Sequence, residues 1–159
     1  MVLIELQQDL FDLDEKEYYF AHCISADFAM GAGIAPQFQK YFGTKSKLLE
    51  RYYNDLAENT YLEYRWESLQ IAGIKGDCIL VDKVFNLITK KYCYEKPTYH
   101  SLYDALLTLR ALCCQMDVKK LAMPRIGCGL DRLDWPSIKD CISDIFRNMD
   151  IEITICYLN

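Results

Sequence analysis

The segment Met123–Trp135 (MPRIGCGLDRLDW) constrains the fold of this chain more than any other stretch. It includes the end of the apolar run Leu121–Met123 and precedes a segment with helical spacing, while its proline and two glycines interrupt regular structure. The pattern predicts a strand, a glycine-rich loop and a helix in succession, with backbone N–H groups of the loop free to face an anion. Asp131 adds a carboxylate at the edge of this loop. We therefore expect an α/β protein that binds a nucleotide-like ligand.

Length, charge and hydropathy restrict the class of protein. The chain has 159 residues, of which 52% are hydrophobic, so residues 1–159 are expected to form a single domain. Its net charge of −5, without a block of lysine and arginine, argues against broad attraction to nucleic acid, although it leaves room for a local basic pocket. No apolar run approaches the roughly 20 residues that span a bilayer, and the start shows no signal-peptide pattern. We expect a soluble, monomeric protein of the cytoplasm that does not bind membranes.

The eight cysteines raise the question of disulfides or metal sites. They form no C-x-x-C pair and the chain has two histidines, so a structural zinc site has little support. Most lie in apolar runs such as Leu112–Cys114 and are predicted to be buried free thiols in a reducing compartment. Cys128 differs because it lies inside the glycine loop, where it faces a ligand or packs underneath one. The sequence offers no paired histidine motif that would mark it as a nucleophile.

Strand and helix patterns alternate along the chain. Strands are expected at Val2–Leu6, Tyr18–Ile24, Ser68–Ile71, Cys78–Val81, Val84–Ile88, Lys120–Met123 and Ile151–Leu158. Helices are expected from Ile34 to a cap at Gly43, at Ser46–Glu58, at Tyr99–Met116 after a Thr98 cap, and at Trp135–Met149. Gly73 and Gly76 mark a turn. This order favours a mixed α/β sheet with helices on both faces.

Several loops are expected to converge on one crevice. In such sheets ligands bind beyond the carboxyl ends of the strands. Asp9, Ser25–Ala35, Thr89-Lys90 and Pro124–Asp131 all follow or end predicted strands. Four loops at one edge of the sheet indicate a ligand-binding crevice more strongly than any single loop does.

The individual residues of these loops have competing interpretations. Gly31-x-Gly33 before a helix suits a phosphate, but two glycines at a strand–helix junction often serve only the turn. Together with Gly127-x-Gly129 they could hold a diphosphate from both sides; the lysine pattern of P-loop proteins and the G-x-G-x-x-G motif are absent. Asp9 suits either an exocyclic amine such as that of adenine or a turn cap. His22 lies in an apolar run, which favours a core histidine over a catalytic one.

Lys90 and Asp131 are the pair that could carry chemistry. A lysine in a crevice can lose its proton and attack an aldehyde-like sugar carbon. A carboxylate beside it can move protons or stabilise a developing cation. Spacing alone favours the alternative that Lys90 and Lys91 are a solvated pair at a strand end.

Five segments, in colinear order over nearly the whole chain, resemble the macrodomain family: Ala21–Ser25, Met30–Ala35, Leu87–Lys91, Lys96–Tyr99 and Met123–Trp135. MPRIGCGLDRLxW is highly specific for the branch that contains the terminal ADP-ribose protein glycohydrolase, whereas MGAGIA occurs in macrodomains more broadly. The resemblance implies a three-layer α/β/α sandwich with a mixed, mostly parallel central sheet that binds ADP-ribose across the strand ends.

The chain departs from the family pattern at two places. Gln8 stands where the family usually has a glycine before the aspartate, which affects the adenine end. Residues 52–80 match weakly and look longer than expected, which affects substrate contacts there.

The resemblance also assigns roles along the crevice. It implies that Asp9 holds the adenine amine and that Leu158 packs beside the adenine. Ser25 and residues 31–35 would line the diphosphate and distal ribose, and Pro124–Leu130 would close over the same groups. The implied ligand-binding set is Asp9, Leu10, Ser25, Met30, Gly31, Ala32, Gly33, Ile34, Ala35, Thr89, Pro124, Arg125, Ile126, Gly127, Cys128, Gly129, Leu130 and Leu158.

The same resemblance implies a reaction. Lys90 matches the lysine that attacks the anomeric carbon of the distal ribose, and Asp131 matches the acid that assists opening and release. The implied activity is hydrolysis of ADP-ribose from an ester-type linkage, in ADP-ribosyl-glutamate or O-acyl-ADP-ribose, with no cofactor and no metal. Three alternatives stay open: a non-catalytic ADP-ribose reader, an antitoxin-like hydrolase of ADP-ribosylated DNA, and a phosphatase acting on ADP-ribose 1″-phosphate. A reader needs neither Lys90 nor Asp131, and the acidic chain offers no obvious DNA groove.

Overall fold

A central sheet organises the fold. The computed structural model describes residues 1–58 and 75–159, without the side chains of residues 52–58. In this part of the chain the sheet has six strands in the order β1-β6-β5-β2-β4-β3. Neighbouring strands are parallel except for β3 and β4, which are antiparallel. The strands are β1 (Val2–Gln7), β2 (Tyr19–Ser25), β3 (Cys78–Val81), β4 (Val84–Lys90), β5 (Lys120–Pro124) and β6 (Glu152–Tyr157).

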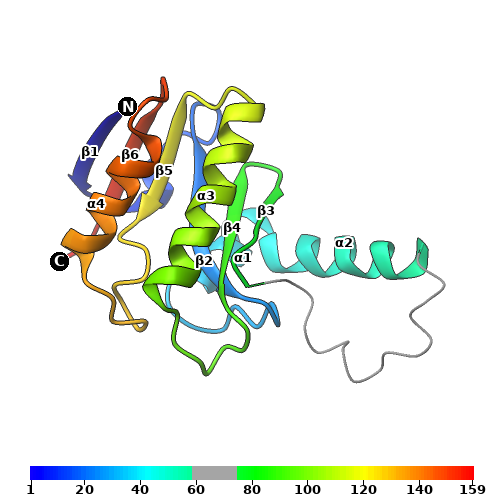
Figure 1. Cartoon of the computed structure of the whole chain (residues 1–159). Helices are drawn as coiled ribbons and strands as arrows, with labels where there is room; N and C mark the ends of the chain where they lie inside the picture. Colours follow the sequence, from blue (N-terminus) through cyan, green and yellow to red (C-terminus); the bar gives the residue numbers. More distant parts are fainter. Residues whose placement is uncertain (59–74) are drawn as a thin grey trace.

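Helices cover both faces of this sheet. Figure 1 shows α3 and α4 in front of the sheet and α1 behind it, with α2 running from the end of α1 outward past β3, which confirms the expected three-layer α/β/α architecture. The helices are α1 (Ala35–Phe42), α2 (Thr44–Glu58), α3 (Tyr99–Gln115) and α4 (Trp135–Phe146), with a short 3₁₀ turn, η1 (Leu10–Asp12), after β1. Within the described ranges, none of the helices combines the length and apolar character that a bilayer crossing requires.

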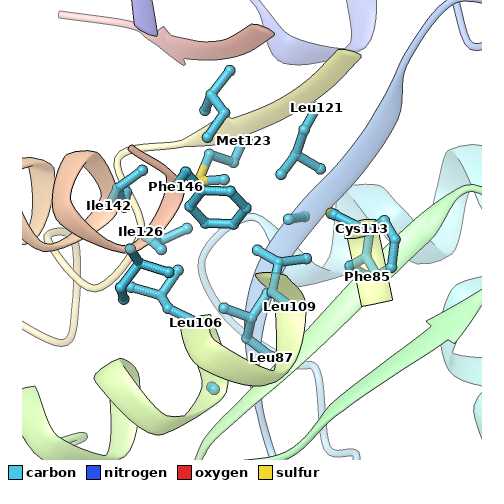
Figure 2. Close-up of a cluster of buried hydrophobic side chains, with 14 of the residues drawn as sticks. Phe85, Leu87, Leu106, Leu109, Cys113, Leu121, Met123, Ile126, Ile142 and Phe146 are labelled. Atoms are coloured by element: carbon cyan, nitrogen blue, oxygen red, sulfur yellow. The ribbon is translucent and has the colours of Figure 1, made fainter. Parts of the chain in front are cut away.

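The largest part of the core lies between the sheet and the pair α3 and α4 (Figure 2). Leu87 of β4, Met123 of β5, Leu109 of α3 and Phe146 of α4 are all fully buried there. The opposite face of the sheet packs against the other helices, for example through Phe38 of α1. Because β2 and β4 are covered on both faces, nearly all of their residues are buried instead of every second one, and the buried residues include the polar His22 and Asn86.

Short-range sequence patterns, such as helix caps, correctly predicted where most helices and strands lie. Thr98 and Ser101 form the reciprocal capping box that starts α3, with both hydrogen bonds at 3.0 Å. Gly43 ends α1 in the left-handed conformation, at φ 64°, as its position after the helical pattern predicted. The predicted strand Ser68–Ile71 and the turn residue Gly73 lie outside the described residues.

Several boundaries differ from the sequence-based expectation. The fourth helix ends at Phe146 rather than Met149, since the backbone N–H of Met149 closes a tight turn onto the Phe146 carbonyl. The closing strand is two residues shorter, as Glu152–Tyr157, and α2 begins at Thr44 instead of Ser46. The 3₁₀ turn after β1 was not predicted, because three residues leave too little periodicity to detect.

Candidate active site

A crevice follows the carboxyl ends of the parallel strands and consists of two adjoining hollows. The first has a volume of about 420 Å³ and the second about 580 Å³, within the range of small-molecule sites. All four loops that were expected to converge contribute to their walls. The residues shared by both hollows are Gly33, Ile34, Pro124, Arg125 and Gly129. The hollows therefore form one elongated site that can hold an extended ligand.

Lys90 and Asp131 meet in the first hollow. The Nζ atom of Lys90 lies 2.9 Å from Oδ1 of Asp131, and their side chains are only 15% and 16% exposed. The neighbouring Lys91 is exposed, so Lys90 and Lys91 are not the solvated pair that spacing alone favoured. An ion pair at this distance is placed for proton transfer between an amine and a carboxylate.

An irregularity in the sheet aims Lys90 into the hollow. Ile24 pairs with Ile88, but the next residue, Ser25, pairs with Lys90, so β4 contains one extra residue, Thr89, relative to β2. In a regular strand consecutive side chains point to opposite faces, whereas a bulge re-aims them. As a result both Thr89 and Lys90 line the first hollow.

The glycine loops and the start of α1 offer backbone groups to the crevice. Ile34, at the N-cap position of α1, makes no side-chain capping bond. Pro36 has no N–H and the N–H of Gln37 bonds to the Ile34 carbonyl, so the backbone N–H groups left at this helix start are those of Ile34 and Ala35, two residues that line the crevice. Gly33 has φ 64°, and a Cβ atom there would face open space rather than protein. Gly127 has φ 73°, and a Cβ atom would lie 3.2 Å from both Ile138 and Leu133. Gly33 thus permits close approach of a ligand, and Gly127 permits close packing beneath the loop.

Asp9 caps a turn and also lines the crevice. Its Oδ1 atom accepts a hydrogen bond of 3.0 Å from the backbone N–H of Phe11 and so caps η1. Asp9 also lines the second hollow, together with Leu10 and the exposed Leu158. A turn cap and a ligand contact are compatible because a carboxylate has further acceptor positions.

A hydrogen-bonded network around Glu5 holds the wall of the second hollow. Glu5 accepts hydrogen bonds from Trp135 Nε1 at 2.9 Å, Lys139 Nζ at 2.8 Å and Arg125 Nη2 at 3.4 Å. The bonds from Lys139 and Trp135 lower the pKa of the Glu5 carboxyl below its ordinary value. Arg125 also stacks on Tyr157, with its Cζ atom 3.9 Å from the ring centroid. The planar guanidinium is therefore fixed by two contacts on one side of the crevice.

Asp27 braces the other end of the crevice. It accepts hydrogen bonds from Ser25 Oγ at 2.5 Å and Ala29 N at 3.1 Å on one oxygen, and from Cys93 N at 3.0 Å on the other. Burial on its own would raise the pKa of Asp27, but these hydrogen bonds together lower it. The carboxylate therefore ties the β4–α3 loop to the β2–α1 loop beside the first hollow.

Comparison with known proteins places this site in a family. No family model matches the chain. The human and bovine proteins named ADP-ribose glycohydrolase OARD1 are 40% and 38% identical to it over 147 residues, a match that covers 92% of this chain and 86% of each relative. The macrodomains of DarG from Thermus aquaticus and Mycobacterium tuberculosis superimpose with TM-scores of 0.71 and 0.73, at 19% and 20% identity. Those two matches cover 98% and 99% of this chain, and the same shares of the two structures. The chain belongs to the macrodomain family.

The thiols of this macrodomain are all free, and two of those that line the crevice, Cys23 and Cys128, are poor nucleophiles. Burial raises the pKa of the Cys23 thiol well above its ordinary value, and burial raises that of Cys128 to about 11. Cys128 lines the second hollow and donates to the backbone carbonyl of Ile126 at 3.2 Å. It therefore faces the ligand space as a wall residue rather than as a reactive group.

His22 is a core residue of the macrodomain, as its apolar surroundings in the sequence favoured. It is fully buried, 2.7 Å from Oδ1 of Asn86, and its ring stacks on Phe38 with a centroid distance of 4.0 Å. Burial lowers its pKa to about 4, so the imidazole is neutral at physiological pH.

Most of the expected ligand-binding residues line the crevice, but three do not. Ser25 is buried against Asp27, Met30 is buried in the core beside α1, and Gly31 is exposed outside both hollows. Residues of the wall that sequence reasoning missed are Gln8, Cys23, Gln37, Cys93, Tyr94, Lys96, Trp135, Cys156, Tyr157 and Asn159. For Cys93, Tyr94 and Lys96 a usable signal existed, because they lie in the loop that follows Lys90 directly.

Proposed function

We propose that this macrodomain hydrolyses ADP-ribose from ester-type linkages, in ADP-ribosyl-glutamate or O-acyl-ADP-ribose. The observation that carries the proposal is the Lys90–Asp131 ion pair, at 2.9 Å and largely shielded from solvent, inside the hollow. The 40% identical human relative is named an ADP-ribose glycohydrolase, which supports the same activity here. A reader would need the glycine loops but neither member of this pair.

The proposal orients the ligand along the crevice. Asp9 and Leu158 would receive the adenine in the second hollow. The backbone N–H groups of Ile34 and Ala35 at the start of α1 and the loop Pro124–Leu130 would hold the diphosphate between them, since both favour an anion. The distal ribose would then reach Lys90. A related macrodomain-containing structure, Thermosipho africanus DarTG in complex with ADP-ribose, has the same fold, with a TM-score of 0.66 at 18% identity over 98% of this chain and 41% of that one.

In the proposed reaction Asp131 accepts a proton from the Lys90 ammonium and leaves a neutral amine. The amine attacks the anomeric carbon, the bond from this carbon to the ester oxygen breaks, and the acceptor leaves as a carboxylate. Water then hydrolyses the lysine-linked sugar, which returns the amine and releases ADP-ribose. Asp131 moves protons in both steps. These steps use side chains alone, so we expect turnover to survive a chelator.

The remaining features of the proposal concern where the enzyme acts. We propose that it acts as a monomer in the cytoplasm on ADP-ribosylated protein or on O-acyl-ADP-ribose. The net charge of −5 disfavours a nucleic-acid substrate.

The test measures ADP-ribose release from glutamate-modified protein and from O-acetyl-ADP-ribose, with and without EDTA. We compare the wild type with Lys90→Ala and Asp131→Ala, and with Lys91→Ala as the matched control because that lysine is exposed. Loss of the nucleophile is expected to lower kcat by about a thousandfold or more, and Lys91→Ala to keep full activity. Calorimetry should show that Lys90→Ala still binds ADP-ribose.

Other outcomes would change the assignment. No release by the wild type, with ADP-ribose still bound, would indicate a reader or a hydrolase of another linkage, and modified DNA would be tested next. Equal loss of binding and turnover in Lys90→Ala would contradict the role of the lysine. Turnover that stops in EDTA would contradict the side-chain mechanism.

A further inference from the structure

Three large apolar side chains are exposed at the end of the crevice that holds Lys90 and Asp131. Tyr94 is 77% exposed, Leu130 is 62% exposed and Tyr99 is 47% exposed. Tyr94 and Leu130 line the first hollow together with the ion pair. We call these three side chains the outer lip. Because Tyr94 and Leu130 belong both to the wall of the hollow and to the exposed surface, a group that projects from the hollow past them contacts apolar side chains.

Hydrogen bonds and ring stacking hold the outer lip in place. The ring of Tyr94 stacks on that of Tyr92, with a centroid distance of 5.3 Å and an interplanar angle of 9°. The Nζ atom of Lys96 donates to the Leu130 carbonyl at 2.5 Å, which links the β4–α3 loop to the glycine loop. The hydroxyl of Tyr99 accepts a hydrogen bond of 3.0 Å from a backbone N–H of the loop that follows Leu130.

This rigidity has a consequence for binding. Exposed aromatic side chains that are already ordered lose little conformational entropy when a partner covers them. Tyrosine is also enriched at interfaces, because its ring contributes apolar area and its hydroxyl remains hydrogen-bonded. The outer lip therefore has the properties of a contact surface rather than of a mobile loop tip.

The position of the lip identifies what would cover it, if the ligand is oriented as proposed. The adenine end of ADP-ribose lies in the second hollow, and the bond to be broken lies at Lys90. Beyond that bond lies the group to which ADP-ribose is attached. An acetyl group is too small to extend from the hollow over Tyr94, whereas a polypeptide that carries a modified glutamate must do so.

We infer that the outer lip, through Tyr94, binds the polypeptide acceptor and favours ADP-ribosylated protein over small acyl esters. The inference rests on the proposed hydrolase function and adds a determinant of substrate class to it. Tyr94 also forms part of the wall of the first hollow, so its loss is expected to weaken the reaction of the protein substrate more than it weakens binding of free ADP-ribose.

The experiment compares kcat/KM for two substrates of the same linkage chemistry: a glutamate-modified protein and O-acetyl-ADP-ribose. The variants are Tyr94→Ala and Tyr94→Phe, with Tyr103→Ala as the control, since Tyr103 is a 43% exposed tyrosine of α3 that lines neither hollow. Tyr94→Ala should lower kcat/KM about tenfold for the protein and by a clearly smaller factor for O-acetyl-ADP-ribose, which has no polypeptide to contact the ring. Tyr94→Phe should retain most of the protein activity, because the ring provides the contact. The affinity for ADP-ribose, by calorimetry, should be unchanged in Tyr103→Ala and should fall less in Tyr94→Ala than kcat/KM for the protein does.

The results separate this inference from the proposed function. Equal loss on both substrates would make Tyr94 part of the ADP-ribose site, and no loss on either would leave the lip without a role; both overturn the inference. A wild type that cleaves O-acetyl-ADP-ribose but not the modified protein would overturn it while leaving the ester hydrolase in place. A wild type that cleaves neither would refute the proposed function itself.

Discussion

Burial of His22 should make the stability of this protein depend on pH. The imidazole is fully buried between Asn86 and Phe38, and burial lowers its pKa from 6.5 to about 4, although the Asn86 contact opposes part of the shift. The unfolded chain therefore binds more protons than the folded chain between these two values. The contribution of neutral His22 to stability is complete above pH 6.5 and is lost as the pH falls towards 4.

The magnitude follows from the two pKa values. One pKa unit corresponds to about 1.4 kcal/mol, so lowering the pH from about 7 to about 5 should reduce the free energy of unfolding by roughly 2 kcal/mol through His22 alone. This is a large share of the roughly 5–15 kcal/mol that stabilises a typical domain. Carboxyl groups titrate over part of the same range, so the absolute slope of the wild type is not diagnostic.

A comparison of variants isolates the histidine. We would measure guanidinium unfolding at both pH values for the wild type, His22→Gln and His100→Gln. The side chain of His100 is 85% exposed, so its variant should keep the pH dependence of the wild type. His22→Gln can still donate to Asn86; it should be less stable at neutral pH but lose about 2 kcal/mol less on acidification. If the wild type and His22→Gln lost the same amount, the buried-histidine argument would be refuted.

Two further predictions concern the glycine loop and the thiols. Gly127→Ala should destabilise the protein by about 1–3 kcal/mol, because φ is 73° and the added Cβ would crowd neighbouring side chains at 3.2 Å; Gly31→Ala, with nothing within 4 Å, should change stability far less. Equal changes in the urea midpoints of the two variants would contradict this. Mass spectrometry after alkylation should find exposed Cys93 and Cys114 labelled before Cys113, whose pKa burial raises to about 12, and ADP-ribose should protect Cys93, which lines the hollow. Uniform labelling rates, or no protection of Cys93, would contradict the described burial and site.

Local signals in the sequence predicted the elements of this fold better than their arrangement. The apolar run at Tyr18–Ile24, the cap at Thr98 and the glycine at Gly43 each act within a few residues, and each marks the element that the structure contains there. The strand order β1-β6-β5-β2-β4-β3 depends instead on contacts between distant segments, which one sequence does not display. The resemblance to macrodomains supplied the three layers and the mostly parallel sheet, but this strand order was not predicted.

The candidate site was predictable in its loops but not in its side-chain directions. The crevice lies at the predicted edge of the sheet, and Lys90 and Asp131 meet there. The bulge at Thr89 was not predictable, because alternation along β4 gives no sign of an extra residue. Ser25 likewise turns to Asp27 rather than to the ligand space, because a short hydrogen bond between two neighbouring loop residues decides its direction. A site role that depends on the direction of one side chain therefore cannot be assigned from the sequence alone.

The pairing of β1 with β6 has a consequence for how the chain is made. Val2 pairs with Glu152, so the first of the described strands to be translated has the last of them as its neighbour. Until β6 has been synthesised, β1 lacks its pairing strand. Glu5 of β1, which holds Trp135 and Arg125 at the crevice, is then not yet fixed in the sheet. Emergence of β6 from the ribosome would therefore complete this side of the sheet and the wall of the second hollow together. A nascent chain stalled before Glu152 should consequently lack a competent ligand site even though Lys90 and Asp131 have already been synthesised.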